Sequence, residues 1–297
     1  CGFETAIKRL VRLITKTLET TRLSLVDIRC IYLGLSGADF DSDVKKLEDA
    51  IRSNFPDMRI KVVNDIMLAF ATEIHEGWGA VSICGTGHNA AVITPEGKVF
   101  GILALKEMLG NWGGGRHLAD QAMHRAFRSF QKTGAYTRLE EFLPEICGVK
   151  DMNELAYAIY SSNYKYHYRF PIPSLVFQLA EEGDIVCRQL IHNMGVEMAE
   201  IMKGLLNKAN FSEKTVPIAL GGSLFCCENN TLLINSYREG LADAALEFDF
   251  RILKRPPVMG AVLLALKDIG IQPDKNLVSA ISENLTPFSY HINDGGA

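Results

Sequence analysis

The sequence has neither a long apolar run nor an excess of basic residues. Its longest apolar stretch, Val258 to Leu266, is far shorter than the roughly 20 residues that a membrane-spanning helix needs. No charged segment followed by an apolar one opens the chain, so we predict neither a secretory signal peptide nor a membrane anchor. Lysine and arginine number 31 against 35 aspartate and glutamate residues, a formal net charge of −4. This charge gives no electrostatic reason to expect a nucleic-acid partner.

Paired cysteines are also lacking. None of the seven cysteines belongs to a Cys-x-x-Cys pair, and their spacing matches no even disulfide framework. We therefore expect reduced thiols, no metal held by the protein and a cytoplasmic location. The seven are Cys1, Cys30, Cys84, Cys147, Cys187, Cys226 and Cys227.

The apolar content is sufficient for two folded domains. The chain has 297 residues, of which 47% are hydrophobic, and a typical domain takes roughly 100–200 residues. The first 76 residues alternate helical and strand patterns, which is typical of a parallel α/β sheet. The expected elements are a helix at 4–20, a strand at 28–35, a helix from Asp41 or Ser42 to Phe55, a strand at 60–63 and a helix at 66–74.

The pattern changes after Gly77, and we place a domain boundary near residue 76. Three apolar segments at 80–84, 90–94 and 99–103 are separated by turn residues, which predicts antiparallel hairpins. We assign 77–269 to the second domain, with a helical insert at about 117–210, strands at 216–220 and 248–253, and a helix from Val258 to about Leu266. The remaining 270–297 form a tail that we expect to pack back on the first domain.

Asn64 and Asp65 follow the second predicted strand directly. Open α/β sheets bind ligands at the carboxyl ends of their strands. An aspartate there can accept the proton of a substrate hydroxyl while that hydroxyl attacks phosphorus. The alternative is that the residue simply caps the following helix.

Gly85-Thr86-Gly87 lies between two predicted strands. Together with the following residues it matches the dinucleotide pattern GxGxx(G/A), but that fingerprint must open a helix. Here Ala90 to Thr94 are apolar and β-branched, so we predict a hairpin loop whose bare backbone N–H groups and hydroxyl can approach phosphate oxygens. The alternative is a tight turn with no ligand.

Two further glycine-rich segments are candidate binding residues. Gly221-Gly222-Ser223 joins a strand to a helix, where a nucleotide could lie on a surface without side chains or where a structural turn is simply required. The segment from Gly110 to Arg116 combines four glycines with an amide, an indole and a guanidinium. Because so many glycines are costly in backbone entropy, we expect a functional segment that faces a sugar or acts as a lid.

The order of these motifs resembles a known family. The chain is similar to the N-acetylglucosamine kinase-type sugar kinases of the actin-like superfamily, a group that also contains the activator ATPases of benzoyl-CoA reductase and 2-hydroxyglutaryl-CoA dehydratase. The similarity covers about residues 2–269. It rests on Gly34-Leu35-Ser36-Gly37, Asn64-Asp65, Cys84-Gly85-Thr86-Gly87-His88, Gly221-Gly222-Ser223 and the PPxxGAxxLA helix after Arg255.

This resemblance implies two actin-like (ribonuclease H-like) α/β domains with an interdomain cleft. It implies an ATP-dependent kinase that uses Mg²⁺ and phosphorylates the hydroxyl of an amino sugar such as N-acetylglucosamine, and we also expect a homodimer. Asp65 would be the base, and Gly85, Thr86 and Gly87 the second phosphate loop. Gly221, Gly222 and Ser223 would flank the adenosine, and the helix after Pro257 would close that pocket. The substrate side would include Ser36, Asn64, Gly110 and Asn111.

The sequence departs from the family pattern in two places. The kinases carry Gly-Gly-Trp-Gly and then Gly-Asp-Glu-Gly, whereas this chain has Leu105 to Met108 and then Gly110-Asn111-Trp112-Gly113. An Asn at this point can hydrogen-bond a hydroxyl but makes no charge-assisted contact. The family's initial Asp-Gly-Gly-Gly-Thr hairpin has no counterpart after Cys1, so we expect a first domain short of one hairpin, with weak or absent kinase activity. The alternatives are an activator-type ATPase and a non-catalytic sugar- or nucleotide-binding homologue.

Overall fold

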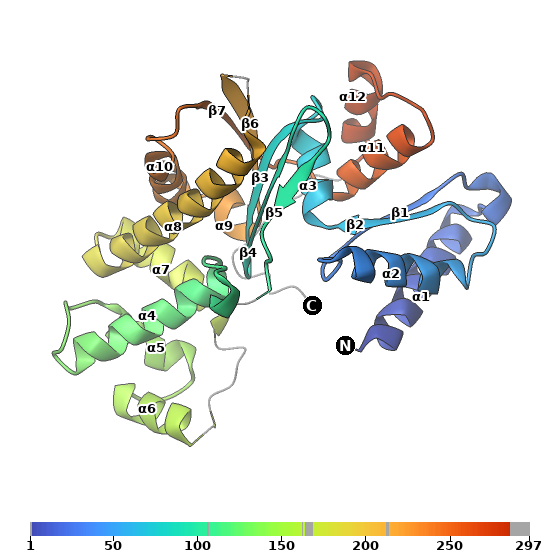
Figure 1. Ribbon diagram of the computed structural model, residues 1–297. Helices are drawn as coiled ribbons and strands as arrows, with labels where there is room; N and C mark the ends of the chain where they lie inside the picture. Colours follow the sequence, from blue (N-terminus) through green and yellow to red (C-terminus); the bar gives the residue numbers. More distant parts are fainter. Residues whose placement is uncertain (1, 106, 162, 164–168, 212–213, 286–297) are drawn as a thin grey trace. The chain divides into compact units, whose positions relative to one another are not determined.

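The computed structural model describes residues 2–105, 107–161, 163, 169–211 and 214–285. Contacts within the chain divide these residues into two compact units (Figure 1). The first unit contains residues 2–75 and 255–285, and the second contains residues 76–254.

The first unit is built on two parallel strands, β1 (Ile31–Leu35) and β2 (Ile60–Asn64). The register pairs Ile31 with Ile60 and Leu35 with Asn64, so the carboxyl ends of both strands lie at one edge. The strand–helix alternation predicted for this region is confirmed. The helices are α1 (Phe3–Thr21), the 3-10 turn η1 (Leu25–Asp27), α2 (Asp41–Arg52), α3 (Ile66–Glu73), α11 (Val258–Asp268) and α12 (Lys275–Glu283).

Helix α2 begins at one of the two residues predicted for its start, but neither of them caps it. The helix begins at Asp41, with Phe40 in the cap position and no side-chain capping bond. Asp41 and Asp43 instead lie in the first turn, where their negative charges are favoured by the helix dipole.

The core of the first unit lies under the amphipathic helix α1. The apolar face of α1 packs against it without any residue of the helix being fully buried. The fully buried core residues are Ala38, Ile51, Phe55, Met58, Ile60 and Val62, and the α1 residues against them are Ile7, Leu10, Val11 and Ile14.

Helix α11 packs on α3 within the first unit. A Cβ at Gly260 would lie 1.9 Å from the Leu68 carbonyl oxygen, so the two backbones touch. The Gly260 N–H donates to Thr72 Oγ1 at 3.0 Å, and the Thr72 hydroxyl donates to the Leu68 carbonyl at 2.8 Å. The assignment of this helix to a second domain spanning 77–269 is therefore wrong. The apolar pattern correctly predicted the helix α11. It did not predict that α11 packs on α3, a contact that requires the glycine at position 260.

Helix α12 contacts α11 and also belongs to the first unit. The rest of the predicted tail, 286–297, lies outside the described residues.

The second unit contains a five-stranded mixed sheet in the order β5-β4-β3-β6-β7. The first three strands along the chain pair antiparallel, which confirms the predicted hairpins, and β6 and β7 continue the sheet in parallel with β3. The strands are β3 (Gly79–Cys84), β4 (His88–Ile93), β5 (Val99–Gly101), β6 (Thr215–Gly221) and β7 (Glu247–Ile252).

The predicted helical insert is present between β5 and β6 (Figure 1). Its longest helix, α8, contacts β4 and packs along α10, and it contributes the methionines Met194, Met198 and Met202 to the core. None of the described helices is long and apolar enough to cross a membrane. The helices of this unit are η2 (Glu107–Leu109), α4 (Gly115–Phe130), α5 (Leu139–Ile146), α6 (Met152–Tyr160), α7 (Ile172–Glu181), α8 (Ile185–Ala209), α9 (Ser223–Cys226) and α10 (Thr231–Gly240).

Candidate functional site

Polar residues gather where the two strands of the first unit end. Ser36 follows β1 and is exposed, while Asn64 ends β2 and pairs with Leu35 in the register. The Asn64 side chain ties this edge together, because its Nδ2 donates to Asp39 Oδ1 at 3.0 Å and its Oδ1 accepts from the Ile66 N–H at 3.1 Å. We call Ser36, Asp39, Asn64 and Asp65 the acidic edge.

Asp65 lies directly before α3 but does not cap it. Its side chain makes no capping hydrogen bond, and Asn64 satisfies the Ile66 N–H instead. Although the residue is partly open to solvent, desolvation of its carboxyl raises the pKa of Asp65 above the ordinary value, the backbone N–H of Ile66 opposes that rise, and the charge of Asp39 adds to it. The carboxylate is thus a stronger base than an ordinary surface aspartate.

Sequence reasoning missed Asp39. Its carboxylate accepts from Asn64 and faces the same edge as Asp65. The available signal was its position four residues after the end of β1, in the loop that begins with Ser36 and Gly37. From the sequence we assigned a substrate contact to Ser36 in this loop but none to Asp39.

The loop between β3 and β4 turns its carbonyl groups inward. The Gly115 N–H donates to the Gly85 carbonyl at 2.7 Å, and the Arg116 N–H donates to the Thr86 carbonyl at 3.0 Å. The Gly87 carbonyl accepts from the Gly85 N–H at 3.0 Å. Among the described residues, Thr86 and Gly87 donate no backbone hydrogen bond, and both are exposed. A loop with satisfied carbonyls and available N–H groups favours an anion.

The three glycine-rich motifs of the second unit meet at this loop. Gly114 has a φ of +90°, and a Cβ there would lie 2.4 Å from the Cα of Gly87. Gly222 has a φ of +88°, and a Cβ there would lie 2.4 Å from the Cys84 carbonyl oxygen. Only glycine combines these φ values with such close contacts. We call the segments 85–87, 113–115 and 221–223 the glycine cluster.

Asn111 holds the same hairpin through its side chain. Its Nδ2 donates to the His88 carbonyl at 3.0 Å, while its Oδ1 is buried and has no hydrogen-bond partner in the described part of the chain. The neighbouring Gly110 is exposed with a φ of +84°. A contact of Gly110 or Asn111 with substrate remains a prediction.

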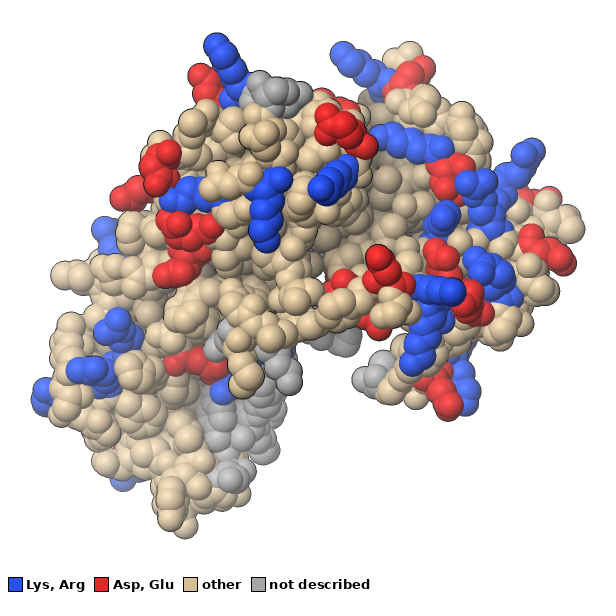
Figure 2. All heavy atoms as spheres, viewed as in Figure 1, with Lys and Arg blue, Asp and Glu red and all other residues tan. Residues whose placement is uncertain are grey.

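Charged side chains of both signs lie on the face of the molecule that Figure 2 shows, where Lys and Arg are intermixed with Asp and Glu. No group of three or more His, Cys, Asp or Glu side chains that could hold a metal ion occurs in the part of the chain that the structure describes. None of the six described cysteines forms a disulfide.

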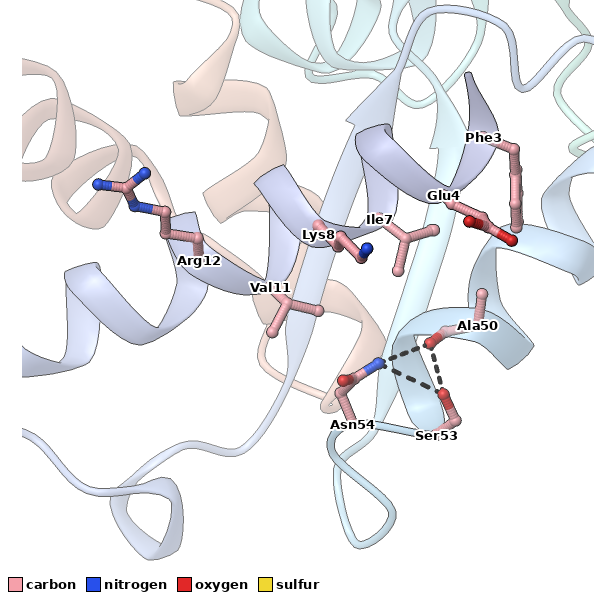
Figure 3. A pocket seen from close by; sticks show the side chains of 9 residues that line it. All are labelled: Phe3, Glu4, Ile7, Lys8, Val11, Arg12, Ala50, Ser53 and Asn54. Atoms are coloured by element: carbon pink, nitrogen blue, oxygen red, sulfur yellow. Dashed lines mark hydrogen bonds between the residues drawn. The ribbon is translucent and has the colours of Figure 1, made fainter. Parts of the chain in front are cut away.

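A groove of about 480 Å³ lies between α1 and α2 (Figure 3). At its lower edge the Asn54 side chain donates to the Ala50 carbonyl at 3.0 Å and to the Ser53 hydroxyl at 3.3 Å. None of the predicted site residues lines it. The lining residues are Phe3, Glu4, Ile7, Lys8, Val11, Arg12, Ala50, Ser53 and Asn54.

Two characterised sugar kinases are similar to the chain over most of its length. It is 26% identical over 260 residues to the N-acetylmuramic acid/N-acetylglucosamine kinase of Clostridium acetobutylicum, a match covering 87% of this chain and 84% of that protein. It is 21% identical over 265 residues to the N-acetyl-D-glucosamine kinase of Dictyostelium discoideum, covering 88% and 82%.

Solved structures support the same fold. A protein from Chromobacterium violaceum with the provisional name N-acetylglucosamine kinase matches with a TM-score of 0.63 at 17% identity, covering 88% of this chain and 86% of that one. The ROK hexokinase of Thermus thermophilus matches with a TM-score of 0.56 at 16% identity, covering 90% and 88%. Residues 1–265 match the sequence profile of the BadF/BadG/BcrA/BcrD ATPase family. This match confirms the predicted resemblance: the chain has the actin-like α/β fold and belongs to the BadF/BadG/BcrA/BcrD ATPase family.

Proposed function

We propose that the protein is an ATP-dependent kinase that transfers the terminal phosphoryl group of ATP to a sugar hydroxyl. The observation that carries this proposal is the loop at 85–87, whose carbonyls are all occupied while the N–H groups of Thr86 and Gly87 remain available. Positioned backbone donors stabilise the charge of a phosphoryl group, and positioning with charge neutralisation provides most of the rate in such reactions.

The glycine cluster would bind the nucleotide. Thr86 contributes a hydroxyl beside the backbone donors, and the absence of side chains at Gly85 and Gly87 leaves room for phosphate oxygens. A Cβ at Gly85 would lie 3.9 Å from both the backbone nitrogen and the hydroxyl of Ser223, so the segment 221–223 borders the same surface. This proximity supports Gly221, Gly222 and Ser223 as neighbours of the adenosine.

Asp65 would act as the general base toward the sugar hydroxyl. A pKa above the ordinary aspartate value increases its proton affinity, and the carboxylate form must be present for catalysis. Activity should therefore fall as the pH drops through that raised pKa. Ser36, Asn64, Gly110 and Asn111 are the candidate sugar contacts.

Mg²⁺ would accompany the nucleotide. This ion keeps several waters and is usually held by substrate phosphates together with one or two carboxylates. Because phosphates and waters supply most of its ligands, a dedicated cluster of three protein ligands is not required. The metal would neutralise phosphate charge during transfer.

An amino sugar is the proposed substrate class, because the curated relatives act on N-acetylglucosamine or N-acetylmuramic acid. We also propose a cytoplasmic location, which the cysteine spacing suggests, and a homodimer, which the family resemblance suggests.

The second candidate function is an activator-type ATPase coupled to a reductase or dehydratase. The family match favours it, because that family is described by its ATPases.

Sugar-dependent ADP release distinguishes the two candidates. We expect release from MgATP to rise at least tenfold when N-acetylglucosamine or N-acetylmuramic acid is added, with glucose as the comparison sugar. Sugar-independent release, together with iron in anaerobically purified protein, would favour the activator. ATP binding without release in either condition would indicate a non-catalytic homologue.

A further inference from the structure

His88 follows the loop 85–87 directly and is the first residue of β4. Its side chain is almost completely buried, with 2% of the residue exposed. The imidazole Nε2 lies 3.1 Å from the Ser82 hydroxyl oxygen, and Ser82 is itself fully buried on the neighbouring strand β3. This side-chain bond joins β3 to β4 next to the loop 85–87, and these two strands hold the two ends of the loop.

The same residue also supports the segment 113–115. The His88 carbonyl accepts from Asn111 Nδ2 at 3.0 Å. A Cβ at Gly113 would lie 3.2 Å from the His88 Cβ, so the glycine backbone lies against this side chain. One residue therefore contacts both the hairpin and the segment that opens α4.

The loop depends on those two supports. Its carbonyls at Gly85 and Thr86 are held by the N–H groups of Gly115 and Arg116, at the start of α4. Any shift of β4 or of the segment 113–115 would move these donors relative to the loop. The direction of the free N–H groups of Thr86 and Gly87 would change with them.

A purely structural histidine is the alternative. A buried polar residue needs a partner, and Ser82 supplies one without any reference to a ligand. The chain contains a useful comparison, because His192 Nδ1 lies 3.2 Å from the Ser236 hydroxyl and joins α8 to α10. That pair is the same type of bond in the same unit, but neither residue adjoins the glycine cluster in the sequence, as His88 does.

We propose that His88 is a positioning residue for nucleotide binding: its imidazole, bonded to Ser82, fixes the loop 85–87, while its main-chain carbonyl, bonded to Asn111, joins the hairpin to the segment that precedes α4. The inference rests on the proposed function, since it assigns His88 an effect on the nucleotide. It goes beyond that function because the almost completely buried His88 would act through the loop and not by touching the substrate.

Four variants test it. His88→Leu and Ser82→Ala each remove the bond from one side, and Ser82→Ala does so without a large change in volume. His88→Gln keeps a polar group near the position of Nε2, and His192→Leu breaks the comparison bond. The measurements are the Kd for ADP by calorimetry and the KM values for ATP and for the sugar.

We expect His88→Leu and Ser82→Ala to raise the Kd for ADP and the KM for ATP about tenfold, since each leaves a buried polar group unpaired. The KM for the sugar should stay within about twofold. His88→Gln should recover to within about threefold of the wild type, and His192→Leu should leave the nucleotide values unchanged.

The measurements distinguish a failure of this inference from a failure of the proposed function. If the wild type binds nucleotide and neither Ser82→Ala nor a folded His88→Leu weakens that binding, the inference is overturned while the proposed function stands. Equal increases in both KM values, or an equal effect of His192→Leu on ADP binding, would also overturn it. No nucleotide binding by the wild type would contradict the proposed function and the inference together.

Discussion

The acidic edge and the glycine cluster differ in which part of each residue provides the polar atoms. At the acidic edge the polar atoms belong to side chains, and Asn64 holds the loop by bonds to Asp39 and to the Ile66 N–H. In the glycine cluster the functional atoms are backbone donors, and the parts are held by backbone bonds and by close contacts at Gly114 and Gly222.

This difference predicts two kinds of sensitivity. A side chain that extends into solvent can be changed without disturbing the packing beneath it, so its loss affects chemistry alone. A glycine that touches another backbone cannot accept a Cβ without a shift of the main chain. Changes at Asp65 should separate activity from stability, whereas changes in the glycine cluster should reduce both.

Replacing Asp65 with Asn should give the largest effect. We expect kcat to fall by about 10²- to 10³-fold, because the amide cannot accept the proton of the sugar hydroxyl. The melting temperature should change little, since the Asp65 side chain makes no capping bond. Asp57→Asn is the matched control, because Asp57 is also exposed in the first unit. Near-normal turnover by Asp65→Asn would reject Asp65 as the base.

Gly114→Ala tests the glycine cluster and should reduce both its stability and its binding of nucleotide. The φ of +90° and the contact with Gly87 predict a loss of about 3 kcal/mol in the free energy of unfolding, with at least tenfold weaker ADP binding. Gly204→Ala is the control: Gly204 lies in α8 with open space around it, so alanine should raise helix stability by about 0.5–1 kcal/mol. Denaturant unfolding and calorimetry measure both. A stable Gly114→Ala protein with normal ADP binding would contradict the assigned contact.

Much of this arrangement could be predicted from the sequence. Short apolar segments separated by turn residues predicted the β3–β4–β5 hairpins, and the position of Asn64-Asp65 after a strand placed it at the carboxyl edge of the sheet. These features depend on neighbours in the chain, and local patterns carry that information.

Contacts between distant segments could not be predicted in the same way. The packing of α11 in the first unit depends on the contact between Gly260 and Leu68, which are separated by nearly two hundred residues in the sequence. Asp39 is recognised as part of the site only from its hydrogen bond with Asn64. His88 is recognised only from its contacts with Ser82 and Asn111. A glycine or a buried histidine has the same appearance in a sequence whether it contacts solvent, a helix or a loop.

Acid should destabilise the protein through His88. Burial lowers the pKa of His88 from 6.5 to about 4, with the backbone of Trp112 opposing the shift. Below pH 6.5 the unfolded chain binds a proton at this residue while the native protein does not, so stability falls as the pH falls toward 4. Between pH 7 and pH 5 the loss should be about 2 kcal/mol. The nearby Cys84 and Tyr237 stay neutral, because burial raises the pKa of both.

Thermal unfolding of His88→Gln and His192→Gln between pH 7 and pH 5 isolates this contribution. The fall in stability should be smaller by about 2 kcal/mol in His88→Gln and should persist in His192→Gln. An identical fall in wild type and His88→Gln would show that other groups account for the acid sensitivity.

The smallest expected effect lies at the acidic edge and concerns charge alone. Asp39→Asn keeps an oxygen that can accept from Asn64 Nδ2 but removes the negative charge that raises the pKa of Asp65. The acid limb of the kcat/KM profile, which reports the base in the free enzyme, should move to lower pH. Turnover at pH 8, on the alkaline side of this limb, should change less than about twofold. A limb that stays in place while turnover falls would assign Asp39 a direct contact with metal or substrate, and the acidic edge would then contain two working carboxylates instead of one.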